Sequence, residues 1–507
     1  MSLDQPFPPM ACNRAIFLPS AESSLKEMLY IAQCLERRGT LVPSFVIRTP
    51  MREHWLDEIR KAGHELIVTP AAQRAIVDPE LPAQGDSAKP VDPTLDAVGP
   101  AIVARLLAAP RRVLRWVGNR LMLDSLSRYA RAMRRFRTDC RQASRLLDQL
   151  VPALLVTPSD RTIGLETALL AEGRRRGIPS LVIPWCLWTP RSEVYARMER
   201  SNIEQAVNLA RLLNRRVAHR FPGQVLEQDE HRLLFAPGET ILAANRMGIL
   251  PPRPFAFFGG GGLADRVAVE SPALRAVCLQ RGVPATNVRL TGRASADQVA
   301  ARLRQGPRYR AQLQMEFGLR PHLKTILCAV PNTAEQNLCS WTQHEQDTHR
   351  LFQAMRSAGA CNVLLNLHPK SNPGTYRAIA EQYRFTIAEG RAIEELLPAC
   401  DLFVSTFSST IVTAIGCHKP VLNLDIYGAR DDMFGRCQGV VTVRDWDAAA
   451  VELRSLIRDE VRFQRLLEAQ QVDASHWGMF DGHCGARLMV EMENLVRNRL
   501  AARREAA

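Results

Sequence analysis

Two polar loops contain the residue types best suited to bind phosphate or to transfer a proton. His368-Pro369-Lys370 follows the apolar run Val363–Leu367, and a loop rich in hydroxyl groups follows the run Leu402–Ser405. A histidine at a strand end can donate a hydrogen bond to a phosphate oxygen or protonate a leaving group near neutral pH. The proline would restrict the turn and the lysine adds positive charge. The first loop is therefore a candidate phosphate site.

The second loop would place its hydroxyl groups at the start of a helix. Ser408, Ser409 and Thr410 precede or open the predicted helix Ile411–Gly416. The first N–H groups of a helix are free, and the helix dipole favours an anion there. The same residues are also typical of a simple helix cap, and a His-Pro pair is typical of a plain turn. Because parallel strands end at one edge of a sheet, both loops would face one crevice, and this pairing favours a functional site.

Two further loops have the same arrangement. Thr291-Gly292 follows the predicted strand Val288–Leu290, and Asn332-Thr333 follows the predicted strand Thr325–Val330. Gly259–Gly262 is a different case, because neither a Gly-Lys-Ser/Thr sequence nor a G-x-G-x-x-G pattern accompanies it, and we predict a flexible turn there. We expect a metal-free phosphate or diphosphate site formed by Thr291, Gly292, Asn332, Thr333, His368, Pro369, Lys370, Ser405, Ser408, Ser409 and Thr410.

Two acidic residues in the first half of the chain are candidates for a catalytic base. Asp160 follows the predicted strand Ala153–Thr157, and Glu22 follows the first predicted strand. Either carboxylate could accept a proton from an acceptor hydroxyl. Either could equally be an N-cap residue, and the sequence does not decide between them. The predicted catalytic residues are therefore Asp160, Glu22 and His368.

The elements that must position these residues alternate between strand and helix patterns. Short, continuously apolar runs are typical of parallel strands that are buried on both faces. The N-terminal part alternates three such runs with two helical patterns: strands at Ala15–Pro19, Val42–Arg48 and Leu66–Pro70, and helices at Ser23–Arg38 and Met51–Ala62. This order predicts an α/β fold with a doubly wound parallel sheet.

The length of 507 residues suits two α/β domains. Residues 71–100 are rich in Pro, Gly and Asp and predict a surface loop, which a helical insertion at about 100–150 follows. The segment 221–255 contains several Pro and Gly residues and predicts an irregular connection. We therefore expect a first domain at 12–235, a second domain at 240–480 and a terminal helix at 481–507; an acceptor role for the first and a nucleotide-sugar role for the second are implied only by the family resemblance described below.

The net charge of +14 indicates an anionic partner. Much of this charge is local, because twelve arginines and only three aspartates lie between Arg105 and Asp148. Basic amphipathic helices bind anionic membrane surfaces, although a solvated face on a core helix is the more common outcome. We do not expect nucleic acid as a partner, since no aromatic-stacking or zinc motif accompanies the arginines.

The remaining totals favour a cytoplasmic globular protein. Hydrophobic residues make up 46% of the chain and charged residues 23%, and the 12 cysteines have no metal-like spacing. Scattered cysteines of this kind are typical of reduced thiols. No apolar run is long enough to span a membrane, and the first twenty residues lack the basic and apolar regions of a secretory signal.

The second half of the chain resembles the nucleotide-binding domain of GT-B glycosyltransferases. The segments that resemble it are Ala264–Ser271, Arg281–Pro284, Val288–Arg293, Asn366–Lys370, Cys400–Thr410 and Gly416–Leu422. Their order is similar to that of bacterial capsule and surface-polysaccharide transferases of the polysialyltransferase-like and Kdo-transferase-like types. It also resembles CDP-glycerol glycerophosphotransferases and UDP-N-acetylglucosamine 2-epimerases. The resemblance covers residues 240–430 well and residues 12–200 only in pattern.

This resemblance implies two Rossmann-like domains that face a central cleft, with an Arg-rich helical insertion in the first. It implies a metal-independent glycosyltransferase with no cofactor other than the nucleotide-sugar substrate, and a glycan or lipid-linked acceptor. In it, His368 would contact the donor phosphate and Ser408, Ser409 and Thr410 would line the same site. The alternatives are a 2-epimerase and a non-catalytic scaffold at the membrane. The epimerases have Ser-Gly-Gly at Phe407-Ser408-Ser409 and a glutamate in the Pro184-Trp185-Cys186 segment, so this chain differs from them at both places.

Overall fold

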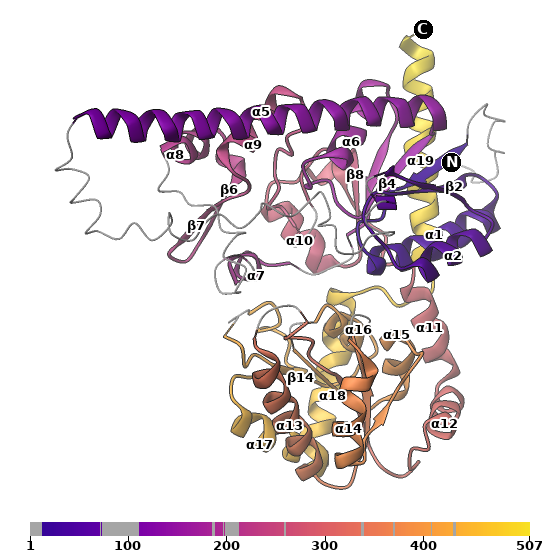
Figure 1. Ribbon diagram of the computed structural model, residues 1–507. Helices are drawn as coiled ribbons and strands as arrows, with labels where there is room; N and C mark the ends of the chain where they lie inside the picture. The colour runs from indigo at the N-terminus through magenta and orange to yellow at the C-terminus, as the bar shows by residue number, and fades with distance from the viewer. Residues whose placement is uncertain are drawn as a thin grey trace. The chain divides into compact units, whose positions relative to one another are not determined.

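The computed structural model describes residues 13–70, 72–73, 111–184, 188–195, 197, 212–257, 260–335, 339–368, 371–406, 408–428 and 432–506. These residues form two compact units, each containing parallel strands with helices around them (Figure 1). The first unit contains the described residues up to 184, residues 212–267 and the chain from Met492 onward. The second contains the described part of 186–203 and Ala268–Glu491. The boundary that we expected at 235–240 therefore falls within the first unit.

A seven-stranded sheet has the strand order β3-β2-β1-β4-β5-β8-β9. Its strands are β1 (Arg14–Phe17), β2 (Val42–Ile47), β3 (Glu65–Val68), β4 (Leu154–Thr157), β5 (Ser180–Val182), β8 (Arg266–Val269) and β9 (Val288–Leu290). The chain adds strands on one side of β1 and then returns to add β4 on the other side. The point between β1 and β4 is therefore a topological switch point, where open α/β sheets bind ligands.

The helices of the first unit follow the periodic pattern of apolar residues in the sequence. They are α1 (Glu22–Arg38), α2 (Glu53–Lys61), α5 (Arg111–Leu150), α6 (Leu165–Arg175), α8 (Leu212–Arg220) and α9 (Gly238–Arg246). In α1 the buried apolar residues recur every three or four positions, as one face of a helix requires. The helix ends at Gly39, whose φ of 70° is left-handed and favours glycine.

Two parts of the first unit differ from the sequence-based expectation. The segment 221–255, expected to be irregular, contains the hairpin β6 (Val225–Gln228) and β7 (His231–Leu234), followed by α9. These strands have four residues each, too few to show a clear alternation. The Arg-rich insertion forms one 40-residue helix, α5, which lies along α6 and α9 (Figure 1). Its apolar residues between Met133 and Leu150 pack in the core of the first unit.

A six-stranded parallel sheet lies in the second unit, with the order β12-β11-β10-β13-β14-β15. Its strands are β10 (Thr325–Ala329), β11 (Asn362–Asn366), β12 (Thr386–Ile387), β13 (Leu402–Ser405), β14 (Val421–Leu424) and β15 (Val440–Val443). Buried apolar clusters cover both faces of this sheet, which explains why its strands are continuously apolar. The switch point lies between β10 and β13, because β11 and β12 extend the sheet on one side and β14 and β15 on the other.

The helices of the second unit include several that begin just beyond strand ends. They are α7 (Pro190–Val194), α10 (Pro272–Gln280), α11 (Ala296–Gln305), α12 (Pro307–Glu316), α13 (Trp341–Ser357), α14 (Pro373–Tyr383), α15 (Ile393–Leu396), α16 (Thr410–Gly416), α17 (Trp446–Arg458), α18 (Glu460–Trp477) and the first turns of α19 (Cys484–Ala506). Asp459 separates α17 from α18, since its backbone is extended and its side chain caps α18 by accepting the Arg462 N–H at 3.0 Å.

The expectations about membrane-spanning helices and about reduced cysteines can be compared with the described residues. Within them, no helix is both long and apolar enough to cross a bilayer. The cysteines of the same residues are all free thiols, and six of the ten are buried. Burial raises the pKa of several of these thiols, for example that of Cys278 to about 12, because the thiolate is poorly solvated there.

Candidate functional site

The loops that follow β10 and β13 flank the switch point of the six-stranded sheet. They contain Asn332 and Thr333 on one side and Thr406 and the Ser408–Thr410 segment on the other. The loop after β11 begins at His368 and lies one strand further along the same edge. The fold therefore brings three of the four predicted loops to one edge of one sheet.

His368 is partly exposed and lies two residues beyond the end of β11, at this edge of the sheet. Its carbonyl oxygen accepts a hydrogen bond from the Ser371 N–H at 2.8 Å, which closes the turn. Pro369 and Lys370, two of the predicted binding residues, lie outside the described residues. Only the hydrogen bond between Ser371 and His368 is therefore observed, and the position of the lysine charge stays a prediction.

The hydroxyl groups at the end of β13 and in the loop after it fall into two classes. Ser408 Oγ lies 2.6 Å from Thr410 Oγ1 and accepts the Thr410 N–H at 3.2 Å, so these hydroxyls make local bonds at the start of α16. By contrast, the hydroxyls of Ser405 and Thr406 are buried and have no hydrogen-bond partner among the described residues. Ser405 is only 1% exposed. A buried hydroxyl without a hydrogen-bond partner is unfavourable by about 1–3 kcal/mol. A bound ligand could supply the partner that these two hydroxyls lack.

Thr333 is held by protein groups. It is 4% exposed, and its hydroxyl lies 2.8 Å from His344 Nδ1 on α13. The Cys339 thiol also donates to it at 3.3 Å. The neighbouring Asn332 is partly buried in the same loop. The Thr333 side chain is therefore engaged inside the protein, which the strand-and-loop pattern did not indicate.

The fourth predicted loop, Thr291-Gly292, follows β9 at the margin of the seven-stranded sheet. Gly292 has a φ of 79°, and a Cβ there would lie 2.3 Å from Cys484 Sγ. The Thr291 hydroxyl donates to the Gly292 carbonyl at 2.9 Å, and Arg487 donates to the Thr291 carbonyl at 2.9 Å. These contacts give the pair a packing role against the start of α19.

A small pocket in the second unit connects this loop with α16. Its volume is ≈ 20 Å³, about that of one water molecule, and its lining includes Ser409, Arg293, Glu270 and Glu394. Arg293 pairs with Glu270 at 2.9 Å. These three charged residues were not among the predicted site residues. The one available signal was the position of Arg293 directly after the Thr291-Gly292 turn.

In the first unit, both candidate acids flank the switch point between β1 and β4. Asp160 is 1% exposed, and its carboxylate accepts the N–H groups of Gly261, Leu263 at 2.7 Å and Ala264 at 2.9 Å. Burial raises the pKa of Asp160, and these backbone hydrogen bonds oppose that rise. The carboxylate therefore holds the 260–264 loop, and its geometry fits a structural role better than that of a base.

Glu22 is more accessible, with a quarter of its side chain exposed. It is the first residue of α1, and its carboxylate accepts several hydrogen bonds from Arg52, including Arg52 Nε at 2.9 Å. Burial alone would raise the pKa of Glu22, but the hydrogen bonds from Arg52 outweigh that effect, so the pKa is lowered. Glu22 is therefore ionised at neutral pH.

A buried ion pair that the sequence did not reveal lies at the same edge of the seven-stranded sheet. Glu166, the second residue of α6, is fully buried and pairs with Arg48, the residue after β2. Burial raises the pKa of Glu166 to about 7, although the charge of Arg48 opposes the rise. The Thr157 hydroxyl donates to Glu166 at 3.3 Å. Glu166 therefore ties the ends of β2 and β4 to α6.

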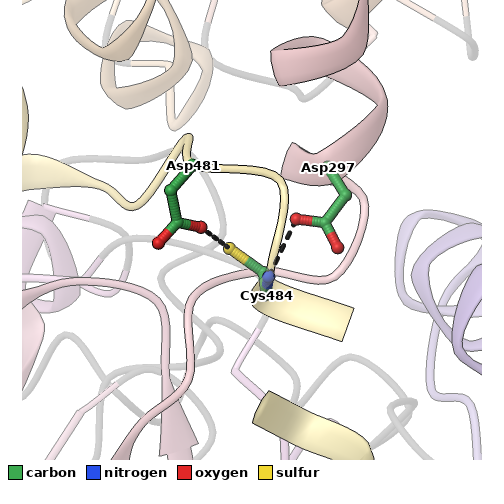
Figure 2. A group of neighbouring side chains, drawn as sticks. All are labelled: Asp297, Asp481 and Cys484. Atoms are coloured by element: carbon green, nitrogen blue, oxygen red, sulfur yellow. Dashed lines mark hydrogen bonds between the residues drawn. The ribbon is translucent and has the colours of Figure 1, made fainter. Parts of the chain in front are cut away.

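One group of side chains has the composition of a metal site but not its chemistry. Asp297, Asp481 and Cys484 each place one ligand-type atom within 4.8 Å of the others (Figure 2). Asp297 accepts the N–H groups of Cys484 and Gly485, both at 2.8 Å. Asp481 pairs with Arg487 at 2.8 Å, and burial raises the pKa of Cys484 to about 12. The cluster therefore caps α19, and its two carboxylates are already engaged by backbone N–H groups and by Arg487.

Comparisons with known proteins agree with this architecture. No protein-family model matches the sequence, and no curated protein is significantly similar to it. Among solved structures, a UDP-GlcNAc 2-epimerase from Neisseria meningitidis bound to UDP-GlcNAc has a TM-score of 0.51 at 12% identity, with 94% of this chain and 98% of that chain covered. A Listeria monocytogenes protein assigned as a UDP-N-acetylglucosamine 2-epimerase has a TM-score of 0.52 at 13% identity, with 96% of each chain covered. A glycosyltransferase from Rickettsia africae has a TM-score of 0.48 at 10% identity, with 96% and 99% covered.

The chain has the GT-B fold. This confirms the predicted α/β class with two Rossmann-like sheets. At this level of identity the likeness concerns the fold alone, so the reaction must be inferred from the site residues. The switch points of the two GT-B sheets are the natural places to look for them.

The Arg-rich insertion of this GT-B chain has a sharply divided surface. The apolar side of α5, including Met133, Phe136 and Leu147, is buried against the first unit. The opposite side exposes a row of arginines for which no ion pair is found among the described residues: Arg131, Arg134, Arg137, Arg141 and Arg145. From Met133 to Leu150 the apolar face of the helix is therefore unavailable to lipid. Any membrane contact there would be electrostatic.

Proposed function

We propose that the protein is a metal-independent glycosyltransferase that transfers a sugar from a nucleotide-activated donor to a surface-polysaccharide or glycolipid acceptor. The observation that supports this most strongly is the pair of buried hydroxyls, on Ser405 and Thr406, without partners beside a switch point. A phosphate oxygen would satisfy them at the place where open α/β sheets receive phosphorylated ligands.

The departing nucleotide would develop negative charge, and stabilising that charge is the main requirement of such a transfer. His368 would donate a hydrogen bond to a donor phosphate from the end of β11. The Ser408–Thr410 segment would add hydroxyl and N–H donors, and Asn332 and Lys370 would complete the edge. Arg293 is a described cation beside Ser409, and its charge would favour the same anion.

The acceptor hydroxyl needs a group that accepts its proton. Of the two predicted acids, Glu22 has the better exposure for this role, since Asp160 is buried and bound to three backbone N–H groups. Glu22 lies at the switch point of the first sheet, as an acceptor-binding residue would. Because Arg52 keeps it ionised, it is available as a proton acceptor.

The second candidate is a nucleotide-sugar 2-epimerase, which the fold likeness to two proteins of that class favours. The two activities differ in one requirement, since an epimerase converts its substrate without an acceptor. The change from Ser-Gly-Gly to Phe407-Ser408-Ser409 is the reason we place the transferase first.

The test has two steps. A thermal-shift screen with CMP, CDP, UDP and GDP should reveal one preferred nucleotide, because a ligand that binds only the folded state raises the melting temperature. Incubation with UDP-N-acetylglucosamine alone should then give no 2-epimer. Formation of the epimer would identify an epimerase, and the absence of any nucleotide shift would leave only the scaffold alternative.

We further propose that the exposed arginines of α5 attach the protein to the anionic cytoplasmic face of a membrane, where a lipid-linked acceptor would be found. Each basic residue near such a surface contributes roughly 1 kcal/mol, and salt screens the attraction. Five exposed arginines are therefore enough for reversible attachment without insertion.

A further inference from the structure

A chain of hydrogen bonds links the loops that follow β10 and β11 through a histidine on α13. Thr333 Oγ1 lies 2.8 Å from His344 Nδ1, and His344 Nε2 lies 2.8 Å from the Tyr376 hydroxyl. Tyr376 in turn donates to Glu335 Oε1 at 2.8 Å, and the Ser371 hydroxyl donates to the same oxygen at 2.7 Å. Thr333 and Glu335 belong to the first loop and Ser371 to the second, and Tyr376 lies at the start of α14, which that loop enters.

The chemistry of the groups decides the direction of every bond. Glu335 is ionised: burial alone would raise its pKa, but hydrogen bonds from Ser371 and Tyr376 outweigh this and lower it. An ionised carboxylate only accepts, so the single Tyr376 proton points to Glu335. The Tyr376 oxygen must then accept from His344 Nε2–H.

The remaining nitrogen of His344 is therefore the acceptor for Thr333. Burial lowers the pKa of His344, and the nearby charges of Glu335 and Asp347 oppose this only in part, so the ring is neutral. A neutral ring with a proton on Nε2 has a lone pair on Nδ1. The Thr333 hydroxyl thus donates its proton to His344, and it has no proton left for a ligand.

Burial makes this arrangement costly to disturb. Thr333, His344, Tyr376 and Ser371 are all at most 9% exposed. Removing one member of a buried network leaves its partner without a hydrogen bond, which costs more than the bond itself contributes. The two loops should therefore keep or lose their conformation together.

We infer that the chain Thr333–His344–Tyr376–Glu335–Ser371 is a positioning relay that joins the loops after β10 and β11 into one unit at the ligand edge of the second sheet. Its members are positioning residues. The inference rests on the proposed function only for the identity of the ligand, because the relay itself is a property of the ligand-free protein. In the proposed function, it would hold Asn332 and His368 in register for one donor nucleotide.

The structure also supplies a matched control. Further along the same two helices, about one turn on α13 and two turns on α14, His349 Nδ1 lies 3.2 Å from the Tyr383 hydroxyl, and both residues are partly exposed. This pair has the same chemistry but contacts neither loop in any described hydrogen bond. Tyr383→Phe therefore removes an equivalent hydroxyl without touching the relay.

The experiment measures backbone hydrogen exchange in the full-length protein without ligand. Tyr376→Phe and, separately, Thr333→Val should each raise exchange roughly three- to tenfold in both segments 330–335 and 371–376, while Tyr383→Phe leaves both unchanged. The double variant Thr333→Val/Tyr376→Phe should add little to either single change, since the two residues act through one histidine. An increase confined to the mutated loop, or simple additivity, would overturn the relay.

Two further measurements separate the relay from the proposed function. Histidine ¹⁵N NMR, assigned with His344→Gln, should show the Nε2–H form for His344 at pH 7.5, and an Nδ1–H form would contradict the bond directions. The affinity for UDP should fall in Tyr376→Phe and stay unchanged in Tyr383→Phe. If the wild type binds no nucleotide but the exchange pattern is as expected, the proposed function fails and the relay stands.

Discussion

His368 is the single side chain whose removal should most affect ligand binding. We expect His368→Ala to weaken nucleotide binding by about 1.5–3 kcal/mol, the range for a hydrogen bond to a charged group. Isothermal calorimetry with the nucleotide found in the thermal screen measures this. The control is His322→Ala, an exposed histidine that precedes β10 and so lies toward the opposite edge of the sheet. Equal nucleotide affinities for the two variants would show that His368 does not contact the nucleotide.

The serines at the start of α16 can be tested against a serine that only caps a helix. We expect Ser408→Ala/Ser409→Ala to lower nucleotide affinity several-fold, since hydroxyl and N–H donors at this edge would bind the donor phosphate. Ser371 is unsuitable as a comparison because it belongs to the relay with Glu335. Ser340, whose side chain accepts the Gln343 N–H at 3.2 Å, is the better control. An equal effect of Ser340→Ala would show that Ser408 and Ser409 are only caps.

At the scale of elements, α5 combines a buried apolar face with an exposed basic one. Its amphipathic pattern was correctly recognised in the sequence, but the apolar side chains between Met133 and Leu150 pack against the protein rather than lipid. Wild-type protein should float with anionic vesicles at low salt and detach at high salt, because the attraction is screened within about 10 Å at 0.1 M salt.

A variant with Arg131, Arg134 and Arg141 changed to Glu should lose this flotation. The triple change to Lys at the same positions is the matched control, since it retains the charge and should still float. Flotation of the Glu variant with anionic lipid, or equal flotation of wild type with neutral lipid, would show that the arginines only solvate the outer face of the helix.

At the scale of the whole molecule, buried titratable groups make stability depend on pH. Burial lowers the pKa of His64 and His344 below the ordinary value of about 6.5. The unfolded chain then binds more protons than the folded one as the pH falls below 6.5, so these residues destabilise the fold on acidification. Each unit of pKa depression corresponds to about 1.4 kcal/mol. Glu166 acts in the opposite direction, since its raised pKa of about 7 favours the folded state as the pH falls from 7 toward 4.5.

Urea unfolding at pH 7.5 and pH 5.5 tests this balance. His344→Gln should lose less stability between the two pH values than wild type does, even if it is less stable at pH 7.5. Glu166→Gln should lose more, because the opposing contribution is absent. A His344→Gln variant with the same pH dependence as wild type would contradict the buried neutral histidine.

The sequence alone determined most of the buried parallel strands of this protein and the places where the polar loops after them begin. Strands such as β10, β11 and β13 are recognisable because burial on both faces requires short, continuously apolar runs, which is a local property. The polar residues that follow them must lie at one sheet edge, since parallel strands end together. This is why His368, Thr333 and Ser405 could be grouped without a structure.

Only the tertiary structure decided what these residues contact. The partners of Thr333 and Asp160 lie 11 and 101 residues away, and no periodic pattern encodes such pairs. Thr333 contacts His344 because α13 packs beside its loop. Gly292 lies close to Cys484 because α19 packs against it. The apolar residues of α5 from Met133 to Leu150 are buried in the core. The physical reason is that hydrogen bonding and burial depend on distances between elements, which local residue patterns do not specify.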